Sequence, residues 1–214
     1  MKLAVFGGTF NPVHKGHLIA ADFVQKNLGY DRIIFVPSGN PPHKKMEDCV
    51  SGEDRLNMLL AATEGDGRFL ISDCEIKRQG ASYTFDTVAF LMEKYASELE
   101  GKPGLIIGSD LFSGFHLWHR AKELSELCTL ILLRRPVHVS TNAACGKYAE
   151  LNEEQFDPEK EPLFKDAVFV MNPENEVSSS LVREKIRCGE DAESLVGKEV
   201  LGYIKRKGLY GFRQ

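Results

Sequence analysis

Several features that would narrow the class of protein are missing from this sequence. Its five cysteines are scattered along 214 residues without a CxxC pair, as is typical of reduced thiols in a cytoplasm, where we expect the protein. No unbroken hydrophobic run exceeds five residues, so we expect no membrane span. With 27 basic and 31 acidic residues the net charge is −4, which disfavours nucleic acid as a partner, because non-specific binding requires a basic surface.

Short hydrophobic segments alternate with segments of helical periodicity along most of the chain. Strands are expected at 2–6, 32–36, 69–72, 105–107, 129–133 and 167–171, and helices at 16–28, 55–63, 84–99, 120–127, 179–187 and 198–207. This alternation predicts an α/β fold, a doubly wound parallel sheet with helices on both faces and a small helical C-terminal part. The length favours a single domain over 1–214, and the polar, acidic segment at about 137–165 is interpreted as an insertion.

The segment after the first expected strand reads GGTFNPVHKGH, from Gly7 to His17. It is neither a GxxxxGK[ST] loop nor a GxGxxG fingerprint. Paired glycines let backbone N–H groups approach a ligand closely. His14 and His17 are three residues apart, so both rings can face one side of a helix start. The unpaired N–H groups of a helix start favour phosphate as the ligand. Taken alone, the two histidines also fit capping imidazoles or half of a zinc site.

Four further segments are candidates for binding, and each also has a simpler structural interpretation. PSGNPPHK (37–44) fits a stiff surface loop, and SYTFDT (82–87) and VSSSLVR (177–183) fit helix starts capped by a hydroxyl. GSD (108–110) follows an expected strand. The single tryptophan, Trp118, fits a packing residue or a flat surface for an aromatic ligand.

Together these motifs resemble the HxGH nucleotidyltransferase superfamily, and within it the bacterial nicotinate-nucleotide adenylyltransferases, over nearly the whole chain. The resemblance implies a Rossmann-like nucleotidyltransferase fold and the transfer of an adenylyl group from ATP to nicotinate mononucleotide. It further implies Mg²⁺ bound mainly through ATP or pyrophosphate, with no metal ligand supplied by the chain.

The resemblance also assigns the site residues. The catalytic residues are His14, His17 and Arg183, which also bind ATP. The remaining ATP-binding residues are Gly7, Gly8, Thr9, Phe10, Gly108, Asp110, Ser178 and Ser179. The mononucleotide is assigned to Asn40, His43, Lys44, Thr84, Asp110 and Trp118. Ser180 replaces the family's usual threonine and keeps its hydroxyl, and His116 and His119 are given no role.

Three other functions fit parts of the sequence. A sibling transferase would use nicotinamide mononucleotide, phosphopantetheine or a cytidylyl donor, whereas SYTFDT, PPHK and Trp118 favour a nicotinate nucleotide. A non-catalytic nucleotide sensor could share the same scaffold, because fold alone does not determine function. A zinc hydrolase built on the two histidines would contain stoichiometric zinc. The oligomeric state stays open, a homodimer included.

Overall fold

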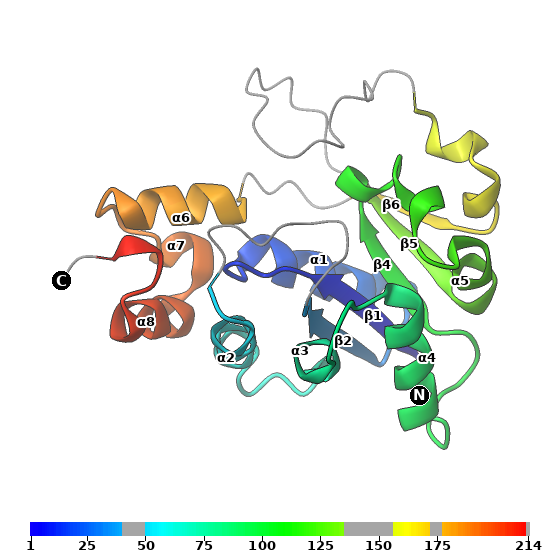
Figure 1. Ribbon diagram of the computed structural model, residues 1–214, viewed down its shortest axis with the longest axis horizontal. Helices are drawn as coiled ribbons and strands as arrows, with labels where there is room; N and C mark the ends of the chain where they lie inside the picture. The colour runs from blue at the N-terminus through cyan, green and yellow to red at the C-terminus, as the bar shows by residue number, and fades with distance from the viewer. Residues whose placement is uncertain (40–49, 135–155, 172–176, 213–214) are drawn as a thin grey trace.

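The computed structural model describes residues 1–39, 50–134, 156–171 and 177–212, and its architecture is shown in Figure 1. The strands are β1 (Leu3–Gly8), β2 (Arg32–Pro37), β3 (Phe69–Ile71), β4 (Gly104–Gly108), β5 (Thr129–Arg134) and β6 (Val168–Met171). The helices are α1 (Lys15–Leu28), α2 (Gly52–Ala62), α3 (Cys74–Lys77), α4 (Thr84–Lys94), α5 (Ala121–Leu127), α6 (Ser179–Arg187), α7 (Glu193–Val196) and α8 (Lys198–Lys207). The short 3₁₀ turns are η1 (Ser109–Leu111), η2 (Phe115–Leu117), η3 (Pro158–Lys160), η4 (Pro162–Phe164) and η5 (Leu209–Gly211). Among these helices none has the length and apolar character needed to cross a bilayer.

The strands form one sheet in the order β3-β2-β1-β4-β5-β6, and every pairing is parallel. The chain winds outward from β1 to β3, and then returns to place β4 beside β1. In β1, Phe6 pairs with Phe35 of β2 on one side and with Ile106 of β4 on the other. The order therefore reverses between β1 and β4, and such a switch point is where open parallel sheets leave a crevice for ligands.

Alternate residues of the central strands point to opposite faces of the sheet and build two hydrophobic clusters. Ala4 and Phe6 belong to the cluster covered by α1, α2, α6 and α8, whereas Leu3 and Val5 belong to the cluster covered by α4 and α5. Strands buried on both faces consist of nearly continuous hydrophobic residues, as these do. The predicted doubly wound sheet with helices on both faces is confirmed.

The predicted helical C-terminal part consists of α6, α7, α8 and η5, which lie together next to α2 in Figure 1. The Tyr203 hydroxyl donates to Asp54 Oδ1 at 2.9 Å and accepts a hydrogen bond from Asn57, so α8 is fixed to α2. Of the segment interpreted as an insertion, residues 137–155 lie outside the described residues. Its remainder forms η3 and η4 and buries Phe164 against Phe112 and Phe115, so that part belongs to the core.

The helix expected over 84–99 is shorter in the structure. α4 ends at Lys94, and the Tyr95 N–H bonds back to Leu91 as the chain turns. Beyond it, the Glu100 N–H donates to the Met1 carbonyl at 2.9 Å. This contact with the start of the sheet draws the chain away from the helix axis, and nothing in the local periodicity signals it.

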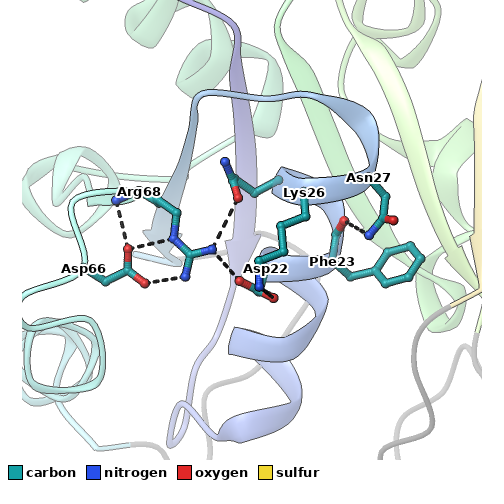
Figure 2. Close-up of polar contacts among 7 residues, drawn as sticks. Asp22, Phe23, Lys26, Asn27, Asp66 and Arg68 are labelled. Atoms are coloured by element: carbon teal, nitrogen blue, oxygen red, sulfur yellow. Dashed lines mark hydrogen bonds and ion pairs between the residues drawn. The ribbon is translucent and has the colours of Figure 1, made fainter.

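A cluster of charged side chains fastens α1 to the turn that precedes β3 (Figure 2). Arg68 forms ion pairs with Asp66 and Asp22, and Lys26 pairs with Asp22 at 2.8 Å. These hydrogen bonds, from Lys26 and Arg68 to Asp22 and from Arg68 to Asp66, hold the pKa of both carboxyl groups below its ordinary value. Asp22, Asp66 and Arg68 are each about one-third exposed, and they tie α1, whose N-cap is His14, to the turn before β3.

Candidate active site

The paired glycines end β1, and Gly108 ends β4, so both segments open on the same edge of the sheet at the switch point. A side chain on Gly8 would place its Cβ 2.9 Å from the ring of Phe10, whereas a Cβ on Gly7 would meet nothing within 4 Å. Gly8 is therefore required by a close approach within the turn. Gly7 faces open space, and a ligand can approach its backbone there.

Phe10 anchors this turn. Its backbone has φ = 50°, and its ring is 2% exposed and packs edge-on against Phe6 and Phe35, with centroids 5.8 and 5.6 Å apart. The ring of His17 lies edge-on to it at 5.0 Å. The Phe10 side chain thus fixes the turn against the core and contacts the His17 ring.

The two histidines are brought together at the start of α1. Their ring centroids lie 3.7 Å apart, with His14 buried and His17 partly exposed. The His14 backbone N–H donates to His17 Nδ1 at 3.2 Å. Because Nδ1 accepts this hydrogen bond, the neutral His17 ring carries its hydrogen on Nε2, and that atom can donate to a ligand.

The start of α6 docks on the same turn. Ser178 caps this helix by accepting from the Leu181 N–H at 3.2 Å, and the Ser179 hydroxyl donates to the Pro12 carbonyl at 2.9 Å. Arg183 donates to the Asn11 carbonyl at 2.7 Å and to Ser180 Oγ at 3.1 Å. Two helix N-termini and a guanidinium with five N–H donors therefore converge beside the histidines, and both features favour a phosphate.

Asp110 lies at the end of β4, within η1. Its Oδ1 would lie 2.7 Å from a Cβ placed on Gly108, so the carboxylate extends over that glycine. Asp110 is exposed, on the β4 side of the switch point and across from the glycine turn. This placement suits a group that binds hydroxyls of a nucleotide lying over the crevice.

The SYTFDT and tryptophan segments also come together. Thr84 is the first residue of α4, and Tyr83 just before it stacks on His119 with ring centroids 4.5 Å apart. Trp118 is partly buried and packs on Phe115 at 5.2 Å. The Tyr83–His119 contact thus makes the start of α4 a neighbour of the segment that holds Trp118, and an anionic aromatic ligand would need both.

Ser82 adds a polar atom at this end of α4. Its side chain is buried, and its hydroxyl has no hydrogen-bond partner within the described part of the chain.

Asn40, His43 and Lys44, the other residues predicted to bind the mononucleotide, lie outside the described residues. Within the described ranges, no group of three or more His, Cys, Asp or Glu side chains could hold a metal ion.

The structure also reveals an arginine that sequence reasoning missed. Arg55 in α2 is 2% exposed and donates to the Thr9 carbonyl at 2.9 Å and to the Ser38 carbonyl at 2.7 Å. A signal was present in the sequence, because Arg55 precedes Met58 and Leu59 by three and four residues and so occupies their buried stripe. A charged residue in such a stripe indicates a specific polar partner in the interior.

A six-stranded parallel sheet with a switch point between β1 and β4, where two helix N-termini and an arginine converge, is typical of a nucleotide-binding α/β protein. Residues 5–185 match the model of the cytidylyltransferase-like family. A protein of Dehalococcoides mccartyi named "probable nicotinate-nucleotide adenylyltransferase" is 38% identical over 210 residues, covering 98% of this chain and 97% of its own. A Clostridium tetani protein of the same name is 37% identical over 209 residues, covering 98% of each chain.

The fold has counterparts among solved structures. The nicotinic acid mononucleotide adenylyltransferase of Plasmodium falciparum, solved in complex with NaAD, superposes with a TM-score of 0.71 at 17% identity, covering 99% of this chain and 98% of that one. The chain belongs to the cytidylyltransferase-like family and, within it, to the nicotinate-nucleotide adenylyltransferases. The family predicted from the motifs is confirmed.

Proposed function

We propose that this chain transfers the adenylyl group of ATP to nicotinate mononucleotide, giving nicotinate adenine dinucleotide and pyrophosphate, a reaction of NAD biosynthesis. The full-length relatives that carry this name support the reaction. For this chain, the reaction is supported by the convergence of His14, His17 and Arg183 with two helix N-termini at the switch point. That convergence suits a triphosphate.

In the proposed mechanism, an oxygen of the mononucleotide phosphate attacks the α-phosphorus of ATP in line. A bond forms from that oxygen to phosphorus, and the bond to the bridging oxygen breaks, so pyrophosphate leaves with the electron pair. The attacking oxygen is already ionised and needs no general base, so catalysis consists of positioning and charge stabilisation. His17 Nε2 and the His14 ring donate to the phosphates, and Arg183 binds the leaving pyrophosphate.

The glycine turn, Gly7 to Phe10, lies along the nucleotide in this proposal, with Gly108 and Asp110 on its other side. The start of α6 at Ser178 and Ser179 contributes backbone N–H groups and hydroxyls to the triphosphate. The residues at this place are mainly hydrogen-bond donors, which fit phosphate rather than a cation. A magnesium ion would therefore be held by phosphate oxygens and water, and would offset the charge of the departing pyrophosphate.

On the mononucleotide side, Trp118 stacks on the pyridine ring, and the start of α4 at Thr84 binds its carboxylate, with Asn40, His43 and Lys44 at the phosphate. The proposed organisation is one domain over 1–214, which the family match across 5–185 supports, with an insertion at about 137–165 whose described end packs on the core. The scattered cysteines support a cytoplasmic reaction.

Substrate choice tests the proposal. N–H groups at a helix start favour an anion, whereas an amide would present its own N–H₂ to them and leave donors unpaired. We expect kcat/KM for nicotinate mononucleotide to exceed that for nicotinamide mononucleotide by at least about 100-fold. The assay is pyrophosphate release with ATP and Mg²⁺, run with each mononucleotide and with phosphopantetheine.

Each alternative has its own outcome in this assay. Equal rates with acid and amide would overturn the acid-specific assignment, and activity with phosphopantetheine alone would indicate a sibling transferase. Nucleotide binding without any pyrophosphate would indicate a sensor. Stoichiometric zinc in the purified protein, measured by atomic emission, would instead favour the hydrolase.

A further inference from the structure

Arg55 joins two loops that leave neighbouring strands. Thr9, whose carbonyl accepts from Nη1, follows β1 in the turn assigned to ATP, and Ser38, whose carbonyl accepts from Nη2, follows β2. A guanidinium is planar and rigid, so the two bonds fix the separation of the two carbonyls as well as their direction. The last backbone hydrogen bond between the two strands runs from the Ser38 N–H to the Gly8 carbonyl, and beyond it the Arg55 side chain holds Thr9 and Ser38 together.

The connection continues from Ser38 to the start of α4. The next residue, Gly39, donates its N–H to Glu75 Oε2 at 3.3 Å, and Glu75 Oε1 accepts from the Thr87 hydroxyl at 2.7 Å. Thr87 is buried in the first turn of α4, and it also accepts from Arg78 at 3.1 Å. Hydrogen bonds thus lead from the ATP side, through Arg55 and Glu75, to the helix whose start is assigned to the pyridine carboxylate.

The packing around Gly39 shows how closely these segments are held. A Cβ at this position would lie 2.0 Å from the Glu75 carbonyl oxygen, so only glycine fits between β2 and α3. A side chain here would push Ser38 away from Arg55 or Glu75 away from Thr87. Gly39 therefore joins the Arg55–Ser38 contact to the Glu75–Thr87 contact at a position where no side chain fits.

Burial of a guanidinium destabilises the folded protein, because the charge loses its hydration. Apolar residues of similar volume at such positions are often equally stable or more so, and a charged group needs hydrogen bonds to be tolerated at all. Arg55 forms its hydrogen bonds with the carbonyl of Thr9, in the turn assigned to ATP, and with that of Ser38, which is connected through Gly39 and Glu75 to α4. In-line transfer depends on alignment of the two substrates to a fraction of an ångström, and this is what a fixed two-point anchor provides.

We infer that Arg55 is a positioning residue that couples the two substrate sites, so that binding of one substrate improves binding of the other. The inference rests on the proposed function. A substrate bound at the glycine turn or at the start of α4 fixes that segment, and Arg55, together with Glu75 and Thr87, passes the constraint to the other segment. The coupling is then a measurable ratio of affinities, and it is the same in both directions.

The experiment compares the wild type with Arg55→Lys. A lysine keeps the charge but offers a single ammonium in place of a planar fork, so it cannot hold both carbonyls in the same geometry. The dissociation constant of an ATP analogue that cannot be cleaved between its α- and β-phosphates is measured by calorimetry with and without saturating nicotinate mononucleotide. The coupling ratio is the constant measured without the mononucleotide divided by the constant measured with it. We expect this ratio to be at least about fivefold smaller in the variant than in the wild type.

Arg68→Lys is the matched control. Arg68 also bridges two elements, but it pairs with Asp66 and Asp22 rather than with a substrate loop. We expect this variant to lose stability and to keep the wild-type ratio. If Arg55→Lys lowers the melting temperature as Arg68→Lys does but leaves the ratio within twofold of the wild type, the inference is overturned and Arg55 is structural only.

A second variant covers the case in which Arg55→Lys does not fold. Thr87→Val removes the hydroxyl that joins Glu75 to α4 at nearly constant volume, and it should lower the ratio in the same direction. An unchanged ratio in that variant would contradict the inference. A wild-type chain that releases no pyrophosphate with nicotinate mononucleotide would overturn the proposed function and this inference together, whereas an active wild type with unaffected variants overturns the coupling alone.

Discussion

The imidazole ring of His17 lies against that of His14, with centroids 3.7 Å apart and planes inclined by 30°. The His14 backbone N–H donates to His17 Nδ1, so the same two residues are joined by a ring contact and by a hydrogen bond. Rings this close can donate to one phosphate group or to two adjacent ones. In the proposed mechanism the two rings therefore bind phosphate as a pair, and substitution of either residue also disturbs the other.

His17→Ala should lower kcat more than it raises KM. In the proposed mechanism, Nε2 donates to charge that grows as pyrophosphate departs, so its loss weakens the transition state more than the ground state. A preorganised donor of this kind contributes about 10²–10³-fold to kcat. Steady-state pyrophosphate release measures both constants. His116→Ala, at an exposed histidine with no assigned role, is the control, and a near-normal kcat with a raised KM for ATP in His17→Ala would contradict the catalytic role.

Trp118→Ala should weaken the mononucleotide and leave ATP nearly unaffected. An aromatic pair contributes roughly 0.5–1.5 kcal/mol beyond buried area, so KM for the mononucleotide should rise by about two- to twelvefold. Trp118→Phe keeps a flat ring and should restore most of the affinity. Because Trp118 also packs on Phe115, circular dichroism must show an intact fold. Equal weakening of both substrates would identify a packing residue instead.

The sequence predicts the fold more fully than the site because hydrophobic periodicity reports burial directly. It predicts α6 and α8 at the residues where the structure has them, and it predicts each strand of the described sheet to within a few residues. Helices α3 and α7 have four residues each, too few for a periodic pattern.

The contacts of Arg55 cannot be predicted from the sequence, for a different reason. Its partners, Thr9 and Ser38, offer backbone carbonyls, and a carbonyl is present at every residue whatever its type. The docking of Arg183 on Asn11 is of the same kind. Motifs therefore indicate which side chains surround the site, whereas the hydrogen bonds that align them become visible only in the folded chain.

Arg68→Met should destabilise the protein at neutral pH and much less in acid. Hydrogen bonds from Lys26 and Arg68 lower the pKa of Asp22, and those from Arg68 lower that of Asp66. A carboxyl with a lowered folded pKa stabilises the protein above its unfolded value of about 3.9, and this contribution is lost as pH falls through the folded value. Because these side chains are about one-third exposed, the discounted difference is about 1 kcal/mol at pH 7.

Urea unfolding of wild type and Arg68→Met at pH 7, 5 and 3 tests this expectation. The difference between the two proteins should be the same at pH 7 and 5, and it should shrink toward pH 3. It should also diminish in high salt. A difference that stays constant down to pH 3 would indicate that Arg68 acts by packing alone.

Cys128 should react with iodoacetamide far more slowly than Cys188 in the native protein. Burial raises the pKa of the Cys128 thiol to about 12, whereas Cys188 is exposed at the end of α6. The thiolate is the reactive form, so at pH 8 the rates should differ by at least about 100-fold. Peptide mass spectrometry over time gives both rates, and in 8 M urea they should converge. Equal rates in the native protein would show that the α5–β5 junction opens.

The contacts between α6 and the turn before α1 have a consequence for synthesis of the chain. The Ser179–Pro12 and Arg183–Asn11 hydrogen bonds join residues 167 and 172 positions apart. Domains fold from the N-terminus during translation, and contacts of such long separation form late because the closure of a long loop must come first. A nascent chain can therefore assemble its first strands while it still lacks Ser178, Ser179 and Arg183, which belong to the proposed phosphate site. Nucleotide binding begins only when nearly the whole polypeptide has left the ribosome, so retention on immobilised ATP would select finished molecules from truncated ones.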